Sequence, residues 1–511
     1  MLAKVLSSAV LGIEAYLIKV EVDISAGLPT FNIVGLPDTS VRESRDRVMA
    51  AIKNSELEFP TKRITVNLAP ADIKKEGASF DLAIALGILA AHGQIQPDSL
   101  KDHVYLGELA LDGSIRSVKG VLPITVGLRD SKIKGIYVPH RNRQEACLAE
   151  NMKVYPLKNL SELVKHLNKE SAIKPHKTDI GEIFNVNSQY GIDFSDVKGQ
   201  LYAKRSLEIA AAGGHNILLV GPPGSGKTML AKRLTTILPD MIMEESIETT
   251  KIHSIVGNLP HNQALIATRP FRSPHHTISD VALIGGGAYP KPGEVSLAHN
   301  GVLFLDELPE FHRNVLEVLR QPLEDGVVTI ARAQSSLTFP AKFMMVAAMN
   351  PCPCGYSGDP KQECVCSVFK IQKYMSKISG PLLDRIDMHI DVPRLKYDEI
   401  TQETLAENSA VIRTRVNRAR IAQRERFAEE KHVYCNAHMQ ARQIRKYCKL
   451  GPESQEMLKH AINKLNLSAR AYDRILKVAR TIADLEGTAQ IQTQNIAEAL
   501  QYRGLDKNLF N

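Results

Sequence analysis

Two short motifs in one stretch of the chain carry residue types that bind and hydrolyse a nucleotide. The first reads G-P-P-G-S-G-K-T at residues 221–228, and the second reads G-V-L-F-L-D-E at residues 301–307. In the first motif, glycines let backbone N–H groups point at phosphates at the start of a helix, while the lysine reaches the outer phosphates and the threonine hydroxyl ligates magnesium. The predicted phosphate-binding residues are Gly221, Pro222, Pro223, Gly224, Ser225, Gly226, Lys227 and Thr228.

The second motif reads as a buried strand, residues 302–305, that ends in two carboxylates. Asp306 can hold magnesium through water, and Glu307 can polarise the attacking water. A similar apolar run, H-N-I-L-L-V at residues 215–220, leads straight into the glycine-rich loop. The alternative is a glycine-rich turn plus a surface acidic pair, but two strands ending in these motifs favour a site for ATP and Mg²⁺.

Four cysteines form two C-x-C pairs: Cys352, Cys354, Cys364 and Cys366. Glycines, an aspartate and a proline lie between the pairs, so the loop can fold back and present four thiolates to one ion. Zinc is the predicted metal ion. Free buried cysteines, an iron–sulfur cluster or a redox pair are the alternatives. Cys147, Cys435 and Cys448 are isolated in the sequence and are interpreted as free thiols, most of them buried.

Length and composition indicate a large protein of a reducing compartment. The 511 residues suggest about three or four domains, and seven cysteines argue against a disulfide framework. The net charge of +8 permits nucleic acid as a partner without requiring it. No apolar run is long enough to span a bilayer, and Lys4 and Glu14 favour a first strand over a signal peptide. We expect a cytoplasmic protein with no membrane partner.

Further elements follow in a fixed order. A polar stretch with Pro175 after Leu167 predicts a linker, residues 203–212 read as a helix, and residues 342–350 read as a buried strand that ends in a polar side chain, Asn350. Next come L-L-D-R-I-D at residues 382–387 and a strand at residues 389–392. Beyond it the pattern is helical to the C-terminus, and Ser468 is placed like the start of a helix.

This order of motifs resembles the AAA+ ATPases and, more narrowly, their magnesium-chelatase-like branch. The resemblance implies that Asn350 is sensor 1, Arg470 is sensor 2, and Arg385 is an arginine finger that acts on a neighbouring subunit's phosphate in a ring. An intrachain pair with Asp384 or Asp387 is the alternative for Arg385, and a surface position at a helix start is the alternative for Arg470. By this reading the linker spans residues 171–192, the AAA+ core spans residues 193–395 with its cysteine-rich loop at 351–367, and the helical lid spans residues 396–511.

Two loops in the core could grip a polymer. One is the insertion that contains S-P-H-H-T at residues 273–277 and three glycines at residues 285–287; the other is a predicted hairpin of strands 327–330 and 337–339. In the branch that the chain resembles, both point into a central pore, and Lys291 and Arg332 are the cations nominated for DNA phosphates. A solvated hairpin with one charge is the alternative. His275 and His276 are assigned to loop packing or subunit contact.

The N-terminal region, residues 1–170, resembles the Lon-protease-like fold through F-N-I-V-G-L-P-D-T-S at residues 31–40 and E-G-A-S-F-D at residues 76–81. Ser79 falls at the position of the family's serine, but Leu122 stands where the lysine is expected. The nearby Lys119 lies three residues before that position. A serine without a base is a poor nucleophile, so no peptidase activity is expected. The expected fold class is therefore α/β multidomain, with a Lon-protease-like α+β N-terminal domain, an AAA+ P-loop α/β core and a C-terminal helical lid.

These features occur together, with N-P-C-P-C-G at residues 350–355 and R-T-I-A-D-L-E at residues 480–486, in the ComM/YifB family, which the chain resembles along nearly its full length. The resemblance implies a homo-hexameric DNA helicase that drives branch migration on single-stranded or branched DNA in homologous recombination and natural transformation, with recombination proteins as further partners. A magnesium-chelatase-type motor subunit and a protein-remodelling AAA+ chaperone are the alternatives.

The residues themselves say little about DNA. Arginines between residues 413 and 426 crowd one predicted helix, and a second basic patch comprises Lys132, Lys134, Arg141 and Arg143. Both could touch phosphates, but a charged helix is usually a solvated face, and acidic residues nearby favour that interpretation.

Overall fold

The structure of the protein is a computed structural model, and it describes residues 1–259, 263–287, 289–332, 335–395, 399, 406–430, 433–465 and 467–503, without the side chains of residues 332, 335 and 465. The chain forms two compact units. The first comprises Met1–Ser188 and Met243–Ala267; the second comprises Gln189–Ile242 and Thr268–Asn511. The predicted boundaries differ from these units, because they assign residues 243–267 to the AAA+ core and treat residues 396–511 as a separate lid.

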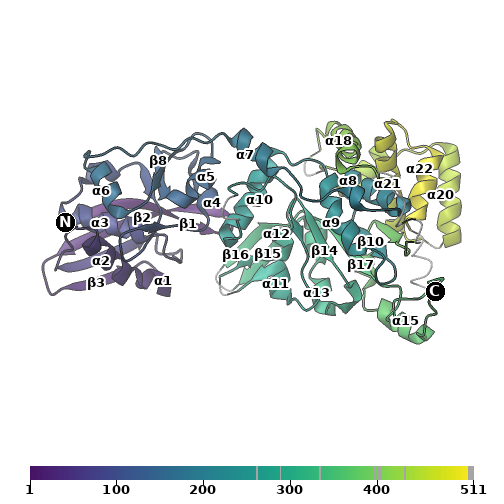
Figure 1. Cartoon of the computed structure of the whole chain (residues 1–511), viewed down its shortest axis with the longest axis horizontal. Coiled ribbons are helices and arrows are strands. Elements are labelled where there is room, and N and C mark those ends of the chain that lie inside the picture. The colour runs from purple at the N-terminus through teal and green to yellow at the C-terminus, as the bar shows by residue number, and fades with distance from the viewer. Residues whose placement is uncertain are drawn as a thin grey trace. The chain divides into compact units, whose positions relative to one another are not determined.

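The first unit is built on a mixed seven-stranded sheet with the strand order β3-β4-β2-β1-β5-β8-β9. Every residue of the apolar helix α3 (Asp81–His92) from Asp81 to Ala91 is buried, and α3 packs on β1 and β2 (Figure 1). A Cβ atom at Gly87 would lie 2.5 Å from the Val22 side chain, so the glycine permits this close approach. The strands of the sheet are β1 (Leu2–Leu11), β2 (Glu14–Ser25), β3 (Thr30–Val34), β4 (Arg63–Ala69), β5 (His103–Tyr105), β8 (Gly135–Pro139) and β9 (Lys153–Leu157).

The remaining elements of this unit surround the sheet or link it. A short hairpin pairs β6 (Glu108–Leu109) with β7 (Ile115–Arg116). The predicted linker is partly helical, since it contains α7 (Ile180–Asn187), which has no buried residue. The other helices are α1 (Thr39–Arg42), α2 (Ser44–Asn54), α4 (Val121–Leu128), α5 (Arg143–Cys147) and α6 (Leu160–Leu167).

Helix α10 (Met243–Val256) completes the first unit. Leu265, just beyond it, is buried in a small apolar cluster with Leu122 and Leu148. The buried Glu145 carboxylate accepts hydrogen bonds from the Ser254 hydroxyl of α10 and from the Leu122 backbone N–H, at 3.1 Å for the latter. Burial raises the pKa of Glu145, and these hydrogen bonds oppose that shift.

The second unit contains a five-stranded sheet in which all pairs are parallel, with the order β11-β14-β17-β10-β18. The central strands β10, β14 and β17 are buried along their whole length, as expected for a parallel sheet covered on both faces. The four predicted strands are therefore confirmed. The five strands of the sheet are β10 (Ile217–Val220), β11 (Phe271–Arg272), β14 (Val302–Leu305), β17 (Met344–Met349) and β18 (Met388–Asp391).

Two β-hairpins lie in the segments that connect the strands of this sheet. The first pairs β12 (Gly285–Gly286) with β13 (Lys291–Pro292), and the second pairs β15 (Val327–Arg332) with β16 (Ser335–Pro340), which confirms the predicted second hairpin. The hairpins touch, because a Cβ atom at Gly285 would lie 3.0 Å from Ile330 Cδ1. The helices here are α8 (Leu201–Gly213), α9 (Lys227–Ile237), α11 (Asp280–Ile284), α12 (Glu294–Leu297), α13 (Arg313–Glu317), α14 (Arg320–Asp325), α15 (Val368–Met375) and α16 (Gly380–Leu383).

The C-terminal helices belong to the same unit and share its core. Buried side chains of α18 and α21 join the apolar cluster of α8, β10 and β18, and Figure 1 shows these helices gathered beside α8. Ser468 caps α21 by accepting a hydrogen bond from the Ala471 N–H, as predicted. None of the helices among the described residues is long and apolar enough to cross a bilayer. The C-terminal helices are α18 (Ser409–Arg426), α19 (Ala441–Tyr447), α20 (Pro452–Leu465), α21 (Ala469–Glu486) and α22 (Thr493–Gln501).

Candidate functional site

The glycine-rich loop joins β10 to α9 at the carboxyl edge of the parallel sheet. Gly224 and Gly226 have φ angles of +77° and +89°, a region that side-chain-bearing residues rarely adopt. A Cβ atom at Gly221 would lie 2.1 Å from the Val392 carbonyl oxygen, so this loop must start with glycine. The residue types and backbone geometry suit a cradle of N–H groups for phosphates.

Lys227 occupies the space inside this loop. Its Nζ donates to the carbonyl oxygens of Gly221 at 2.7 Å and Pro222 at 3.0 Å, and burial lowers its pKa while the charges of Asp306 and Glu307 oppose that shift. It also lies 3.3 Å from Asn350 Oδ1. The ammonium group is therefore held where the outer phosphates of a nucleotide would replace the carbonyl partners.

Thr228 and Asp306 come together across two neighbouring elements. The Thr228 hydroxyl donates to Asp306 Oδ2 at 2.8 Å. A hydroxyl and a carboxylate are the oxygen ligands that Mg²⁺ prefers, usually with several waters and phosphate oxygens completing the shell. The donor set thus fits a magnesium site, as the sequence predicted.

Glu307 follows Asp306 and has an unusual backbone. Its φ angle is +54°, although it is not a glycine, and its side chain is 56% exposed. Strained backbone of this kind is concentrated at functional sites. Glu307 Oε2 lies 3.3 Å from His276 Nδ1, a contact that the sequence did not reveal.

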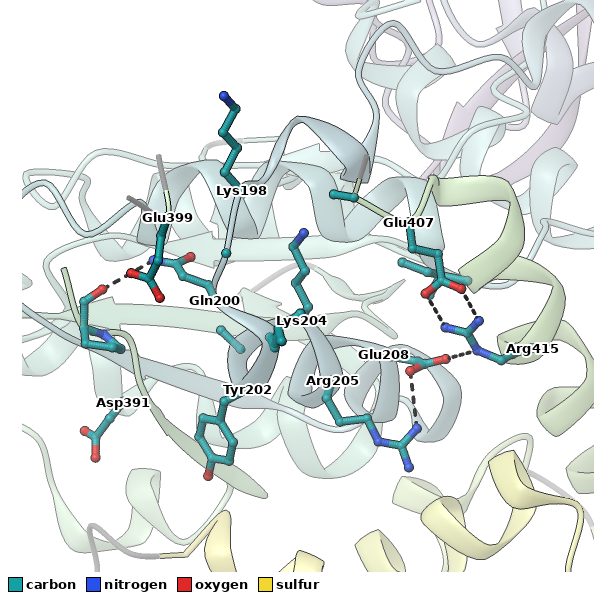
Figure 2. Close-up of a pocket in the computed structure, with 16 residues that line it drawn as sticks. Lys198, Gln200, Tyr202, Lys204, Arg205, Glu208, Asp391, Glu399, Glu407 and Arg415 are labelled. Atoms are coloured by element: carbon teal, nitrogen blue, oxygen red, sulfur yellow. Dashed lines mark hydrogen bonds and ion pairs between the residues drawn. The ribbon is translucent and has the colours of Figure 1, made fainter. Parts of the chain in front are cut away.

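A cavity of about 640 Å³ lies beside the phosphate loop. Gln200 connects the two, because its amide donates to the Ser225 carbonyl at 2.6 Å and to the Pro393 carbonyl at 3.4 Å. Figure 2 shows Gln200 and Glu399 on one side of the cavity and an ion-pair network on the other. A base and ribose attached to phosphates in the loop would have room here. The predicted site lacked these residues, although F-S-D-V-K-G-Q at residues 194–200 was the available signal.

Most arginines of the arginine-rich helix α18 have partners within their own unit. Arg415 pairs with Glu208 at 2.6 Å and with Glu407, and Arg413 lies 3.5 Å from Asp240. Arg426 bonds Asp484, and Arg420 donates to the Ala211 carbonyl at 3.0 Å. These arginines tie α18 to its own unit, which favours the reading of a structural charged helix over a DNA-binding face.

Arg385 and Arg470 lie at the other edge of the sheet. Arg385 follows Asp384 just before β18, and Arg470 donates to Asp384 at 2.9 Å, whereas the phosphate loop follows β10. Because β10 and β18 are parallel and four residues long, about 13 Å of strand separates the two edges. The structure does not bring either arginine to the phosphate loop of its own chain. Arg385 pairs with Glu324, and not with Asp384 or Asp387 as the alternative reading expected, and it donates to the Pro381 carbonyl at 2.6 Å.

A buried charge cluster stabilises the same edge. Asp387 accepts a hydrogen bond from His215 Nδ1 at 3.3 Å and contacts Arg474 at 3.0 Å. Burial would raise the pKa of Asp387, but the His215 bond and the Arg474 charge hold it well below its ordinary value. This cluster joins the amino ends of β10 and β18 to α21.

The four cysteines of the loop after Asn350 converge. Their ligand atoms all lie within 4.8 Å of one another, and Cys352, Cys354 and Cys364 are separated by 3.3 to 3.6 Å. Four sulfurs bound to zinc at about 2.3 Å in a tetrahedron would be about 3.8 Å apart, so the donor set fits zinc. The N–H of Tyr356 lowers the pKa of Cys354 to about 6. Gly355 packs on Pro223, so this loop abuts the phosphate loop. Cys147, Cys435 and Cys448 are free thiols, the last two buried.

The nominated DNA-binding cations lie on the hairpins. Lys291 is exposed on β13. Arg332 ends β15 opposite Ser335, and its side chain lies outside the described residues.

Comparison with known proteins finds relatives along the whole chain. A competence protein ComM of Haemophilus influenzae is 47% identical over 99% of this chain and 98% of its own. An uncharacterised protein YifB of Escherichia coli is 44% identical, covering 98% and 97%. Rice chloroplastic magnesium-chelatase subunit ChlI is 20% identical over 56% of this chain and 67% of its own.

Three family models match successive parts of the chain. "Subunit ChlI of Mg-chelatase" matches residues 20–142, "Magnesium chelatase, subunit ChlI" matches residues 193–400, and "Magnesium chelatase, subunit ChlI C-terminal" matches residues 406–503. The match to residues 193–400 contains the phosphate loop, Asp306, Glu307 and the cysteine cluster.

Proposed function

The chain belongs to the ComM/YifB family of magnesium-chelatase-like proteins, and we propose from this membership that it is a ring-forming AAA+ ATPase that moves DNA strands during recombination. The proposed ATPase activity is supported by one observation. At the carboxyl edge of the parallel sheet, the structure gathers Lys227, Thr228, Asp306, Glu307 and Asn350. The DNA part rests on the relative named as a competence protein.

The chemistry at this edge is phosphoryl transfer to water. Lys227 would exchange its carbonyl partners for the β- and γ-phosphates, and Asn350 beside it would contact the terminal phosphate. Thr228 and Asp306 would hold magnesium, which when bound neutralises charge on the phosphate oxygens. Glu307 would accept a proton from the attacking water. Gln200 and the adjacent cavity would hold the nucleoside.

A ring explains the position of the two remaining arginines. Arg385 and Arg470 lie at the amino edge of the sheet, away from their own phosphate loop. An arginine there is useful for catalysis if it reaches the ATP of the next subunit. We therefore assign both to the trans side of a homo-hexameric interface, with Arg385 as the finger and Arg470 as sensor 2.

The two hairpins are the proposed grip on DNA. They touch at Gly285 and Ile330, so they would move together. Lys291 is exposed on one hairpin, and the strand of the other ends at Arg332. Contacts of this kind to phosphates would be independent of sequence, as branch migration requires.

The N-terminal unit is proposed to be a Lon-like platform without peptidase activity. Leu122, at the position where the lysine is expected, is fully buried in the apolar cluster with Leu148 and Leu265. An apolar side chain there offers no base to activate Ser79.

We propose that Cys352, Cys354, Cys364 and Cys366 hold a structural zinc ion. Four thiolates close the tetrahedral shell and leave no open position, so the metal would have no part in hydrolysis. Its proposed role is to fix the loop between Asn350 and α15, which abuts the phosphate loop through Gly355.

The alternatives are a chelatase-type motor, which the matches to chelatase subunits favour, and a protein remodeller. The polymer that stimulates hydrolysis separates these functions. ATP turnover is measured alone, with single-stranded DNA, with branched DNA and with an unfolded protein. Stimulation by DNA supports the proposal; stimulation by protein alone, or indifference to both, contradicts its DNA part.

A further inference from the structure

Three large apolar residues are exposed beside the cysteine cluster. Val365 lies between the last two cysteines, and Val368 and Phe369 begin helix α15. They are 84%, 71% and 72% exposed, and no aromatic residue in the described part of the chain is more exposed than Phe369. Single apolar residues on a surface are ordinary, but several gathered at one place indicate a surface that binds a partner.

The exposure of Phe369 follows from the way α15 packs. Tyr374 lies on the opposite side of this helix and is buried. Burial raises the pKa of the Tyr374 hydroxyl, and a hydrogen bond from the Asn350 backbone opposes that shift. Lys377, just beyond the helix, pairs with Glu310 at 3.2 Å. The inner face of α15 is therefore held by residues near the ATP site, and Figure 1 shows the helix at the margin of its unit.

The loop that leads into α15 is held as well. The Arg394 guanidinium lies over the Tyr356 ring at 5.3 Å and lies 3.5 Å from Asp359. A Cβ atom at Gly355 would lie 2.5 Å from Pro223, so the loop packs closely on the phosphate loop. A zinc ion on the four cysteines would hold the loop further. A surface that is already ordered loses less conformational entropy when a partner binds.

Two lysines flank Phe369 on the outer face of α15. Lys370 follows it directly, and Lys373 lies one turn further along, where side chains four residues apart are neighbours. Both are exposed, and within the described residues neither forms an ion pair, whereas Lys377 and several arginines of α18 do. Residues 361–377 contain four lysines and one acidic residue, Glu363. This setting favours a negatively charged partner.

We propose that Phe369, with Val365 and Val368 beside it, stacks against an unpaired base of single-stranded DNA, while Lys370 and Lys373 contact the flanking phosphates. An aromatic ring with nearby cations binds single strands in this way without sequence preference. The inference rests on the proposed function in taking DNA as the polymer. It goes beyond that function because it adds a strand-binding surface outside the two hairpins.

The surface fits a single strand better than other partners. In a duplex the base faces are stacked on one another, so a duplex would leave Phe369 exposed. A second copy of the chain could cover the apolar residues, but it would give the two lysines no phosphate to bind. Bound here, a strand separated at a branch point would be kept from pairing again.

The first test measures the Kd for single-stranded DNA of the full-length protein at several salt concentrations. Phe369→Ala should raise the Kd about fivefold to tenfold, because the stacking of one base is lost. It should leave the dependence on salt unchanged, since the ring releases no counterions. Lys373→Ala should instead lower the slope of log affinity against log salt by about 0.7. The Kd of Phe369→Ala for duplex DNA should equal that of the wild type.

A second test reports on the site itself. The chain contains no tryptophan, so Phe369→Trp introduces a single indole that keeps an aromatic ring at the exposed position. Single-stranded DNA should quench its fluorescence, and the Kd should stay within about twofold of the wild type. The matched control is Val186→Trp on α7, where the native residue is 66% exposed; DNA should not quench its fluorescence.

Three results would overturn the inference. The first is an unchanged Kd in Phe369→Ala, or an unquenched indole in Phe369→Trp while DNA is bound; the proposed function then still stands. The second is a loss of ring assembly in Phe369→Ala, measured by light scattering with a non-hydrolysable ATP analogue, which assigns the apolar residues to a second copy of the chain. The third is a wild type that does not bind single-stranded DNA, which removes the DNA part of the proposed function as well.

Discussion

Two variants that are each inactive should restore hydrolysis when they are mixed, if Arg385 serves the neighbouring subunit. Lys227→Ala removes the side chain inside the phosphate loop, and Arg385→Ala removes the proposed finger. In a mixed ring, an interface is intact where the Arg385→Ala chain supplies the phosphate loop and the Lys227→Ala chain supplies the arginine. The structure motivates this design because Arg385 lies at the opposite sheet edge from its own phosphate loop.

The expected size of the effect follows from counting interfaces. Loss of an arginine finger costs about a thousandfold or more in turnover, so each variant alone should be nearly silent. In rings assembled at random from equal amounts, half of the subunits keep the loop and half of their neighbours keep the arginine. The mixture should therefore reach about a quarter of the wild-type rate per subunit. Arg385→Ala should still fold, because its ion-pair partner Glu324 is 59% exposed and such pairs contribute little.

The assay is steady-state phosphate release at constant total protein while the ratio of the two variants is varied. A maximum near equal amounts is expected. Glu324→Ala serves as the control, since it removes the intrachain partner but leaves the finger; it should stay active. Rates in the mixture that equal the sum of the two variants alone would refute the trans assignment of Arg385.

Four further predictions concern separate parts of the molecule. Glu307→Gln should bind ATP normally but lose about a hundredfold or more of turnover, because a general base contributes that much; nucleotide binding and phosphate release measured together check this, and loss of binding would contradict it. Asp387→Asn should lower the free energy of unfolding by about 3 kcal/mol in urea titrations at neutral pH, because it removes the negative charge that faces the buried Arg474 and His215. The depressed pKa of Asp387 means that its contribution is present above the unfolded-state pKa and is lost as the pH falls toward the folded-state value, so the gap between wild type and variant should narrow in acid; a constant gap would contradict this. Elemental analysis of protein purified without chelator should find one zinc per chain and none after Cys352→Ser with Cys364→Ser; wild-type protein without zinc would remove the site. Lys291→Ala should weaken binding of single-stranded DNA and lower the slope of log affinity against log salt by about one, whereas an unchanged slope would exclude a phosphate contact.

The parallel sheet explains why much of the ATP site could be predicted from the sequence. Each buried run that ends in a polar residue places that residue at a shared edge, so Lys227, Asp306 and Asn350 are brought together by topology alone. The cysteine cluster was predictable for a similar reason, because turn-forming residues between two C-x-C pairs leave few ways to close the loop.

Contacts made through irregular segments could not be predicted in this way. His276 meets Glu307 through a loop whose path depends on packing against Phe311, so its spacing in the sequence carries no periodic signal. Glu324 precedes Arg385 by many residues and belongs to a different element, which is why the sequence suggested the adjacent aspartates instead. Helix α10 lies in the first unit because Leu265 and Ser254 contact residues there. A division of the chain into consecutive segments cannot predict that residues 243–267 pack with a unit that precedes them in the sequence.

The proposed branch-migration activity is best measured by strand exchange on a synthetic four-way DNA junction. The wild type is incubated with the junction and ATP, beside Glu307→Gln and beside wild type without nucleotide. Only the wild type with ATP is expected to resolve the junction into two duplexes. A junction that stays intact while the same preparation hydrolyses ATP would contradict the assignment of DNA branch migration.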